Sequence, residues 1–231
     1  MNRLVQPELL DELPPDDPCA LRSRDDLVRV NAWMHNSEAL VSALRATAHA
    51  GPARRLADLG CGDGRFLLRV ARQLHPDWQG THAVLLDRQR ALSPATQQAF
   101  ADLGWQTETH QADVLDWLSQ PAAPRHDLLI ANLFLHHFSD AQLARLLRAV
   151  ARATHVFVAV EPRRSSPCLF FSRCLWFIGC GPVTRHDAVV SVRAGFNGHE
   201  LSRLWPVDGD WTLQERPAGR SNHLFIAQRR K

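Results

Sequence analysis

The sequence predicts one α/β domain built on a doubly wound, mostly parallel sheet. Short apolar runs, expected to be buried strands, alternate with amphipathic segments along most of the chain. A glycine-rich turn joins the first of these strands to a helix. The chain closes with two strand-like segments that flank Pro217-Ala218-Gly219. Its 231 residues suit one domain with a large core.

A helical extension is expected over residues 1–50, before the first strand. Residues 1–24 are acidic and proline-rich, which indicates an irregular leader. Helices are expected over residues 25–33 and 37–50. Ser37 is the expected N-cap of the second helix, and Gly51-Pro52 should end it.

The central region, residues 51–162, carries the alternating pattern. Helices are expected from Phe66 to Leu74 on one apolar stripe, from Pro94 after the cap Ser93, and after a capping box at Ser139 and Gln142. The continuous apolar run of residues 82–86, which closes on Asp87, indicates a buried parallel strand. The expected strands cover residues 55–59, 82–86, 105–110, 126–131 and 156–160.

Residues 163–205 are expected to form a lid on the acceptor side followed by a helix, and residues 206–231 a closing hairpin. An apolar block over residues 169–178, broken by Arg173, is either a buried core helix or this lid, and we expect the lid. Its aromatic side chains could line an acceptor pocket or rest on a membrane surface. Asn197 and Glu200 have the spacing of a capping box for the last helix.

Composition argues against several classes of partner. The net charge is only +3 and the basic residues are spread along the chain, so nucleic acid is not favoured. Five cysteines without a Cys-x-x-Cys pair indicate free thiols, no metal site and a cytoplasmic location. No signal-peptide pattern and no apolar run of about 18 residues are present.

The turn from Leu56 to Phe66 is the most informative motif. Glycines allow a ligand to approach the backbone, and the helix that follows presents free N–H groups. An acidic residue before the turn suits a ligand with both an ammonium and a carboxylate group. The dinucleotide fingerprint would require glycine in place of Arg65. The Asp-x-Gly-x-Gly-x-Gly pattern resembles the first motif of class I S-adenosylmethionine (SAM) methyltransferases. The residues concerned are Asp58, Gly60, Cys61, Gly62 and Gly64.

Further polar residues follow the later strands, where ligands bind in open α/β sheets. Asp87 could accept both ribose hydroxyls of a nucleotide, and Asp113 the adenine amino group. Val114 offers a backbone N–H to a ring nitrogen, and Asn132 is expected near the reacting centre. Taken singly, each acid is also typical of a helix cap. The resemblance covers about residues 50 to 162 and implies SAM as the methyl donor.

A narrower resemblance involves Arg29-Val30-Asn31, Arg164-Ser165 and residues 183–193. These segments look like small bacterial methyltransferases associated with type III polyketide synthases, which are similar to enzymes that O-methylate phenolic lipids. The chain departs from that pattern at residues 161–163, where Glu-Pro-Arg replaces an expected Asp-Leu, and it lacks Gly-Gly after Asn31.

Methylation of a phenol requires alignment of the reacting groups and a general base near neutral pKa, a task that suits histidine. His186 is the first candidate for this base and His137 the second. Asp187 either orients His186 or caps a helix with it, and Arg164 could neutralise an acidic acceptor.

The sequence therefore predicts a SAM-dependent methyltransferase that O-methylates a small hydrophobic, phenolic acceptor. C-methylation of a quinol-like ring is the near alternative. An NAD-dependent oxidoreductase and a cofactor-binding protein without catalysis are the alternatives from other classes. A peripheral membrane contact is expected to be minor.

Overall fold

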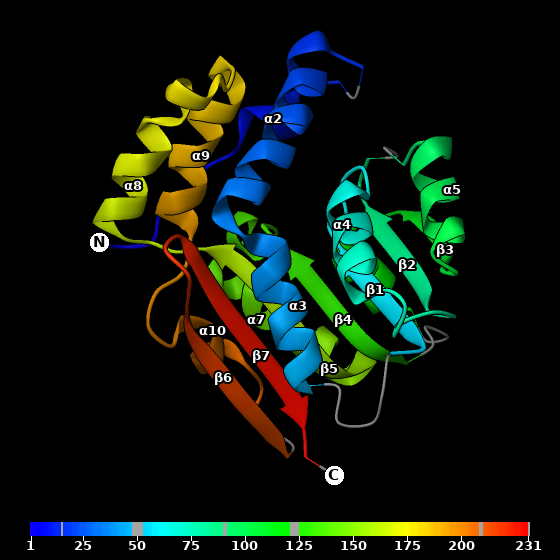
Figure 1. Cartoon of the computed structure of the whole chain (residues 1–231). Coiled ribbons are helices and arrows are strands. Elements are labelled where there is room, and N and C mark those ends of the chain that lie inside the picture. The colour runs from blue at the N-terminus through cyan, green and yellow to red at the C-terminus, as the bar shows by residue number, and fades with distance from the viewer. Residues whose placement is uncertain (15, 48–52, 90–91, 121–124, 208–209, 231) are drawn as a thin grey trace.

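The computed structural model describes residues 1–14, 16–47, 53–89, 92–120, 125–207 and 210–230. A seven-stranded sheet runs through the molecule in the order β3-β2-β1-β4-β5-β7-β6 (Figure 1). The strands are β1 (Arg55–Leu59), β2 (His82–Asp87), β3 (Gln106–Gln111), β4 (His126–Asn132), β5 (Thr154–Pro162), β6 (Trp211–Ala218) and β7 (Asn222–Arg229). The first five are parallel, and β7 runs antiparallel to both β5 and β6. This confirms the predicted mostly parallel sheet with a closing hairpin.

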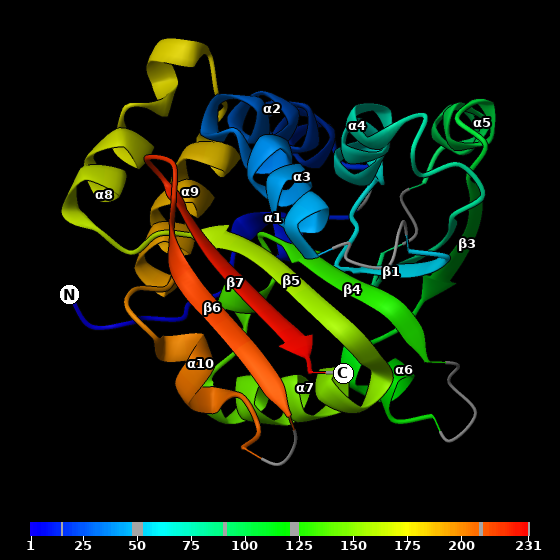
Figure 2. The ribbon, with the colours of Figure 1, turned by 60° about the horizontal axis from the view of Figure 1, so that its bottom comes forward.

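Helices cover both faces of the sheet (Figure 2). One face carries α3 (Asn36–Thr47), α4 (Arg65–Leu74) and α5 (Pro94–Asp102), and the other carries α6 (Val114–Leu118), α7 (Asp140–Ala153) and α10 (Glu200–Leu204). Each face has its own apolar core. Alternate strand residues supply the two cores: Leu56 packs on the α4 side, whereas Ala57 packs on the α7 side.

Local signals in the sequence explain several element boundaries. Ser139 and Gln142 form the predicted capping box before α7, with the Ser139 N–H donating to the Gln142 side chain at 2.9 Å. Ser93 caps α5 and is followed by proline at the first helical position. The hairpin turn lies later than expected, because β6 continues through Ala218.

The irregular leader predicted for residues 1–24 is confirmed for residues 1–8, which form no helix or strand, but is wrong beyond them. A short helix, α1 (Leu9–Glu12), is followed by α2 (Pro18–Met34). Asp17 caps α2 by accepting the N–H of Cys19 at 2.7 Å, and Pro18 takes the first helical position. This aspartate–proline pair was the missed signal for an earlier helix start.

The predicted cap of α3 is also wrong. His35 ends α2 in the left-handed conformation, with φ of 57°, and α3 begins directly at Asn36. Ser37 therefore lies inside the helix. The predicted end of this helix at Gly51-Pro52 lies outside the described residues.

The region between β5 and the hairpin forms α8 (Ser166–Arg173), the short helix η2 (Leu175–Ile178), α9 (Pro182–Ala194) and α10. The last of these begins at Glu200, later than the predicted capping box implies, although the Glu200 side chain accepts the N–H of Asn197 at 2.9 Å.

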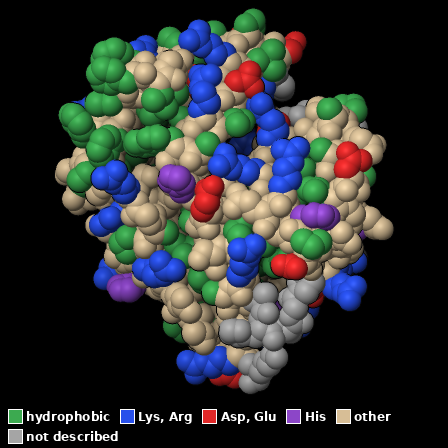
Figure 3. Space-filling view, in the orientation of Figure 1, with side chains coloured by type: hydrophobic (Ala, Val, Ile, Leu, Met, Phe, Trp, Pro, Cys, Tyr) green, Lys and Arg blue, Asp and Glu red, His purple; other side chains and the backbone are tan. Residues whose placement is uncertain are grey.

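The apolar block of residues 169–178 is not a buried core helix. Its large side chains gather at the surface over α8 and η2, at the upper left of Figure 3. Among the described helices, none has the length and apolar character to cross a bilayer.

Candidate functional site

The turn between β1 and α4 holds three glycines with positive φ: Gly60 at 74°, Gly62 at 56° and Gly64 at 75°. A Cβ at Gly60 would lie 2.2 Å from the Phe134 ring, so Gly60 lets this ring pack on the turn. A Cβ at Gly62 would meet nothing within 4 Å. Gly62 therefore leaves open the space in front of the turn.

That space is a cavity of about 590 Å³ beyond the carboxyl ends of β1, β2 and β4. Its volume falls within the range of roughly 300–1,000 Å³ typical of small-molecule sites. With the exception of Gly64, all the residues predicted from the sequence to bind the cofactor line it: Asp58, Gly60, Cys61, Gly62, Asp87, Asp113, Val114 and Asn132. The fold brings these residues to one place because the carboxyl ends of parallel strands meet at one sheet edge.

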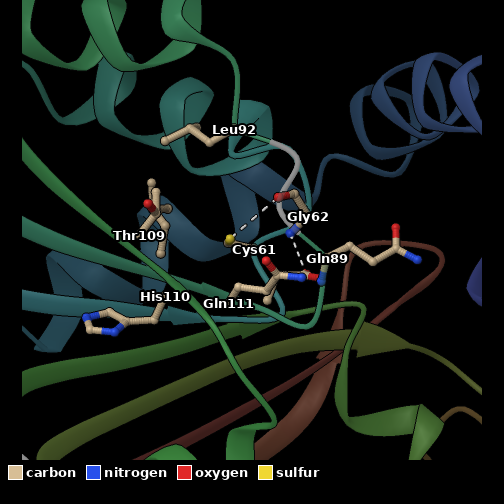
Figure 4. A pocket seen from close by; sticks show the side chains of 9 residues that line it. Cys61, Gly62, Gln89, Leu92, Thr109, His110 and Gln111 are labelled. Carbon is tan, nitrogen blue, oxygen red and sulfur yellow. Dashed lines mark hydrogen bonds between the residues drawn. The ribbon is translucent and has the colours of Figure 1, made fainter. Parts of the chain in front are cut away.

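A second cavity of about 230 Å³ adjoins the first and shares Cys61, Gly62, Asp87 and Gln89 with it (Figure 4). It extends over the ends of β2 and β3, toward Thr109 and His110. The site therefore continues sideways from the glycine turn across the neighbouring strands.

Asp87 holds the glycine turn in place from the end of β2. One carboxylate oxygen accepts the Gly62 N–H at 2.8 Å, and the other accepts the Gln89 N–H at 2.9 Å. Each oxygen keeps a further lone pair for a ligand hydroxyl. Asp87 thus fixes the turn and still faces both cavities.

Asp58 lies deeper, at the end of β1, and is only 2% exposed. Burial, reinforced by the negative charge of Asp87, raises its pKa to about 7. A cationic group placed next to Asp58 would stabilise its carboxylate and so offset both causes of the raised pKa. Burial also raises the pKa of the Cys61 thiol, so this cysteine stays protonated.

Asp113 and Asn132 follow β3 and β4. Asp113 caps α6 by accepting the Leu115 N–H at 2.8 Å, which agrees with the capping role considered for it. The Asn132 amide donates to Oδ1 of Asn31, on α2, at 3.2 Å. The buried Oδ1 of Asn132 has no hydrogen-bond partner among the described residues. An acceptor without a partner at a cavity wall is suited to a ligand that donates a hydrogen bond.

The N-terminal segment forms another wall of the larger cavity, which the sequence did not reveal. Residues 5–8 line it together with Leu10 and Asp11. The Arg3 guanidinium anchors this segment by donating to the carbonyls of Ala194 and Phe138, each at 2.8 Å. The segment is therefore docked on α9 and on the loop after β4.

Glu8 belongs to a buried network with His136 and Glu161. His136 Nδ1 lies 2.8 Å from Glu161 Oε2, and its Nε2 lies 3.2 Å from Glu8 Oε1. Burial opposes a charged imidazole, but the two carboxylates outweigh it and raise the His136 pKa to about 9. Burial likewise opposes a charged Glu8, yet its hydrogen bond with His136 helps to lower the pKa to about 2. Since both ring nitrogens are occupied and His136 stays protonated, it is a poor general base.

Glu161 also organises the loop after β4. It accepts the backbone N–H groups of Phe134 at 3.0 Å and Leu135 at 2.8 Å. This is one of the positions at which the chain departs from the polyketide-associated pattern. Here the carboxylate supports the segment that carries both histidines.

His137 lines the larger cavity and is about one quarter exposed. Its Nδ1 lies 3.3 Å from Oδ2 of Asp11, on α1. A carboxylate beside Nδ1 favours the tautomer in which Nε2 is free to accept a proton. Of the candidate bases named from the sequence, His137 is the one that faces the cavity.

The other predicted catalytic residues lie elsewhere in the described structure. His186 is half exposed, pairs with Asp187 at 2.9 Å and does not line either cavity. Asp187 accepts the N–H groups of Leu9 at 2.8 Å and Leu10 at 3.0 Å, so it holds the start of α1. Arg164 is buried between Glu200 and the carbonyls of Met1 and Gly195.

Comparisons with known proteins give one family match and several similar folds. Residues 56–155 match the family model described as a methyltransferase domain. No curated protein sequence matches the chain. The fold is similar to the plantazolicin methyltransferase BpumL, solved in complex with SAH, with 13% identity, a TM-score of 0.62 and coverage of 93% of this chain and 92% of that one.

Two further solved structures share the fold. An O-methyltransferase family protein from Burkholderia thailandensis is 22% identical with a TM-score of 0.60, over 92% of this chain and 60% of its own. Magnesium protoporphyrin IX methyltransferase from Synechocystis PCC 6803, solved with bound SAM, is 13% identical with a TM-score of 0.55. The likeness covers 90% of this chain and 84% of that one.

Proposed function

We propose that this chain, which matches a methyltransferase domain over residues 56–155, uses SAM to methylate the hydroxyl oxygen of a small, hydrophobic, phenolic acceptor. The observation that carries the proposal is His137, which faces the larger cavity with Asp11 beside it. A phenol becomes a good nucleophile when its proton is removed, and a neutral imidazole is suited to that task.

The residues at the glycine turn fit the methyl donor. The open space in front of Gly62 admits the amino-acid portion, and Asp58 and the unpaired Oδ1 of Asn132 would receive its ammonium group. Asp87 would accept the ribose hydroxyls, and Asp113 and Val114 would contact the adenine. When bound, SAM supplies a methyl group on a positively charged sulfur.

The rest of the cavity fits an apolar acceptor. Its lining beyond the turn includes Leu10 from α1, Val28 from α2, and Phe134 and Phe138 from the loop after β4. These apolar side chains would contact the ring of a flat, hydrophobic molecule, while polar residues of the same lining, such as Arg69 and Gln142, are available to its hydroxyl side. The apolar wall and the histidine lie on the same cavity, as phenol methylation requires.

The chain's own residues would then perform the proton transfer. With the Asp11 carboxylate beside Nδ1 of His137, Nε2 would take the hydroxyl proton as the acceptor oxygen is methylated. Because bound SAM would supply the electrophilic methyl carbon and its sulfur would be the leaving group, the main task of the cavity walls would be to keep the acceptor hydroxyl in line with that carbon. The proton leaves later from His137 to solvent, since this side chain is partly exposed.

The direct test is incubation of the protein with methyl-labelled SAM and separate phenols, quinols and aliphatic hydroxy compounds of similar size. We expect label on the oxygen of hydrophobic phenols, located by NMR of the product. Label on a ring carbon of a quinol, with none on oxygen, would replace O-methylation by C-methylation. Transfer to aliphatic alcohols alone would overturn the phenolic assignment.

A further inference from the structure

A surface patch of large apolar side chains covers α8 and η2 (Figure 3). The side chains of Phe177, Phe170 and Trp176 are 70%, 63% and 54% exposed. We call this cluster the aromatic patch, and its members are Trp33, Phe170, Phe171, Trp176, Phe177 and Ile178. Ring contacts connect it to α2, because the Trp33 and Phe171 rings lie 6.0 Å apart.

The fold gives the aromatic patch no internal role. None of its members lines either of the two described cavities, and none belongs to the buried clusters. Exposed single apolar residues are common, whereas several adjacent aromatic ones mark an interaction surface. Burial of the aromatic patch away from water therefore requires an external partner.

The charge around the aromatic patch indicates the chemistry of that partner. Residues 163–186 contain four arginines and no aspartate or glutamate. Arg173 at the end of α8, Arg185 on α9 and Arg22 on the neighbouring α2 are exposed, whereas Arg164 is buried against Glu200. An exposed acid on α2, Asp25, is paired with Arg65. An apolar centre with a basic rim complements a surface that is apolar inside and anionic outside.

We propose that the aromatic patch docks on an anionic phospholipid bilayer as a peripheral contact. Tryptophan and phenylalanine side chains enter the boundary between headgroups and acyl chains, while arginines stay at the phosphates. A basic rim around strongly exposed aromatic tips is the combination that an anionic bilayer surface complements. The proposal does not depend on the identity of the methyl acceptor.

The position of α2 adds a reason for this docking. Val28 is 39% exposed and also lines the larger cavity, so α2 contributes both to that wall and to the aromatic patch. A molecule dissolved in the bilayer would therefore meet the protein beside its cavity. Docking there shortens the path of a hydrophobic acceptor through water.

The experiment is flotation of the full chain with vesicles of phosphatidylcholine and phosphatidylglycerol, compared with phosphatidylcholine alone. We expect the wild type to float at least about tenfold more with the anionic vesicles. The double variant Phe170→Ser/Phe177→Ser should lose that binding by about tenfold, and Arg173→Glu should lose it in part. Val207→Ser and Arg152→Glu, exposed residues far from the aromatic patch in sequence, serve as matched controls.

A second measurement keeps the result clear if a variant folds poorly. Brominated lipids should quench tryptophan fluorescence in the wild type and less in Trp176→Phe, while circular dichroism checks that each variant is folded. Equal flotation of the wild type and Phe170→Ser/Phe177→Ser would overturn the proposal. A wild-type dimer that this double variant converts to monomer would also overturn it, in favour of a second copy.

Discussion

His136 and Glu161 form a buried ion pair that joins the loop after β4 to the end of β5. His136 Nδ1 lies 2.8 Å from Glu161 Oε2, and both side chains are almost inaccessible to solvent. Glu8 reaches the other ring nitrogen, so the same pair also holds the N-terminal segment. The pair therefore links the wall of the cavity to the core of the sheet.

This pair makes stability depend on pH. The His136 pKa is raised from 6.5 to about 9. Its contribution to the free energy of unfolding is therefore complete below pH 6.5 and is lost as the pH rises through 9. The Glu8 pKa is lowered from 4.5 to about 2, so its contribution holds above pH 4.5. Urea unfolding should thus show a loss of up to about 3 kcal/mol between pH 6.5 and 9. His136→Gln should flatten this slope, and an unchanged slope would contradict the assignment.

Gly62→Val should abolish donor binding, because its side chain would enter the open space in front of the turn. We expect a loss of at least about 100-fold in SAM affinity, or roughly 3 kcal/mol, by calorimetry. Gly219→Val is the matched control, since Gly219 also has positive φ, at 64°, and free space around it. Both variants carry similar backbone strain. Equal affinity of the two would remove the role given to the turn.

Asp87→Ala should weaken SAM binding by about 1.5–3 kcal/mol, the range for hydrogen bonds to a charged group. Asp127→Ala is the control, because Asp127 likewise accepts two backbone N–H groups, at 2.8 and 2.9 Å, but at the opposite end of the strands. Titration calorimetry should separate the two variants. A change of only a few tenths of a kcal/mol in Asp87→Ala would exclude it as the ribose contact.

SAM affinity should fall as the pH is lowered from 7 to 5.5. The pKa of Asp58 is about 7, so acid converts its carboxylate to a neutral group that cannot pair with an ammonium. The expected effect is about tenfold per pH unit below 7. In Asp58→Asn, affinity should be low and independent of pH across this window. A variant that keeps the wild-type pH profile would assign the effect to another residue.

His137→Ala should lower kcat by about 10²- to 10⁴-fold if its imidazole is the general base. His186→Ala is the control, because His186 is half exposed and outside the cavities. The His137 variant should still bind SAM normally. A full loss of turnover in His186→Ala instead would return the role to the first candidate named from the sequence.

The strands were predictable because their signals are local. Residues 82–86 form an apolar run that ends at Asp87, and residues 55–59 lead into the glycine turn; they form β2 and β1 almost as predicted. Periodicity likewise located α4 and α7. The start of α2 was missed because one aspartate–proline pair outweighs the acidic, proline-rich composition of the segment around it.

The donor side of the cavity was predictable for the same reason, since each residue lies at or just after the end of a strand. The acceptor side was not, because it depends on contacts between distant segments. Asp11 lies beside His137 only when the N-terminal segment folds back on the loop after β4. The neighbouring pair His186 and Asp187 had the more suggestive spacing, yet Asp187 is committed to the backbone of Leu9 and Leu10.

The docked N-terminal segment has a consequence for how affinities are interpreted. Part of the cavity wall exists only while residues 5–11 lie in place. An observed dissociation constant therefore contains two equilibria, closure of this segment and occupancy of the closed form. Conditions that loosen the Arg3 or Glu8 contacts would weaken apparent binding without altering a single ligand contact. Resistance of the segment to limited proteolysis, measured across ligand concentrations, would separate the two equilibria.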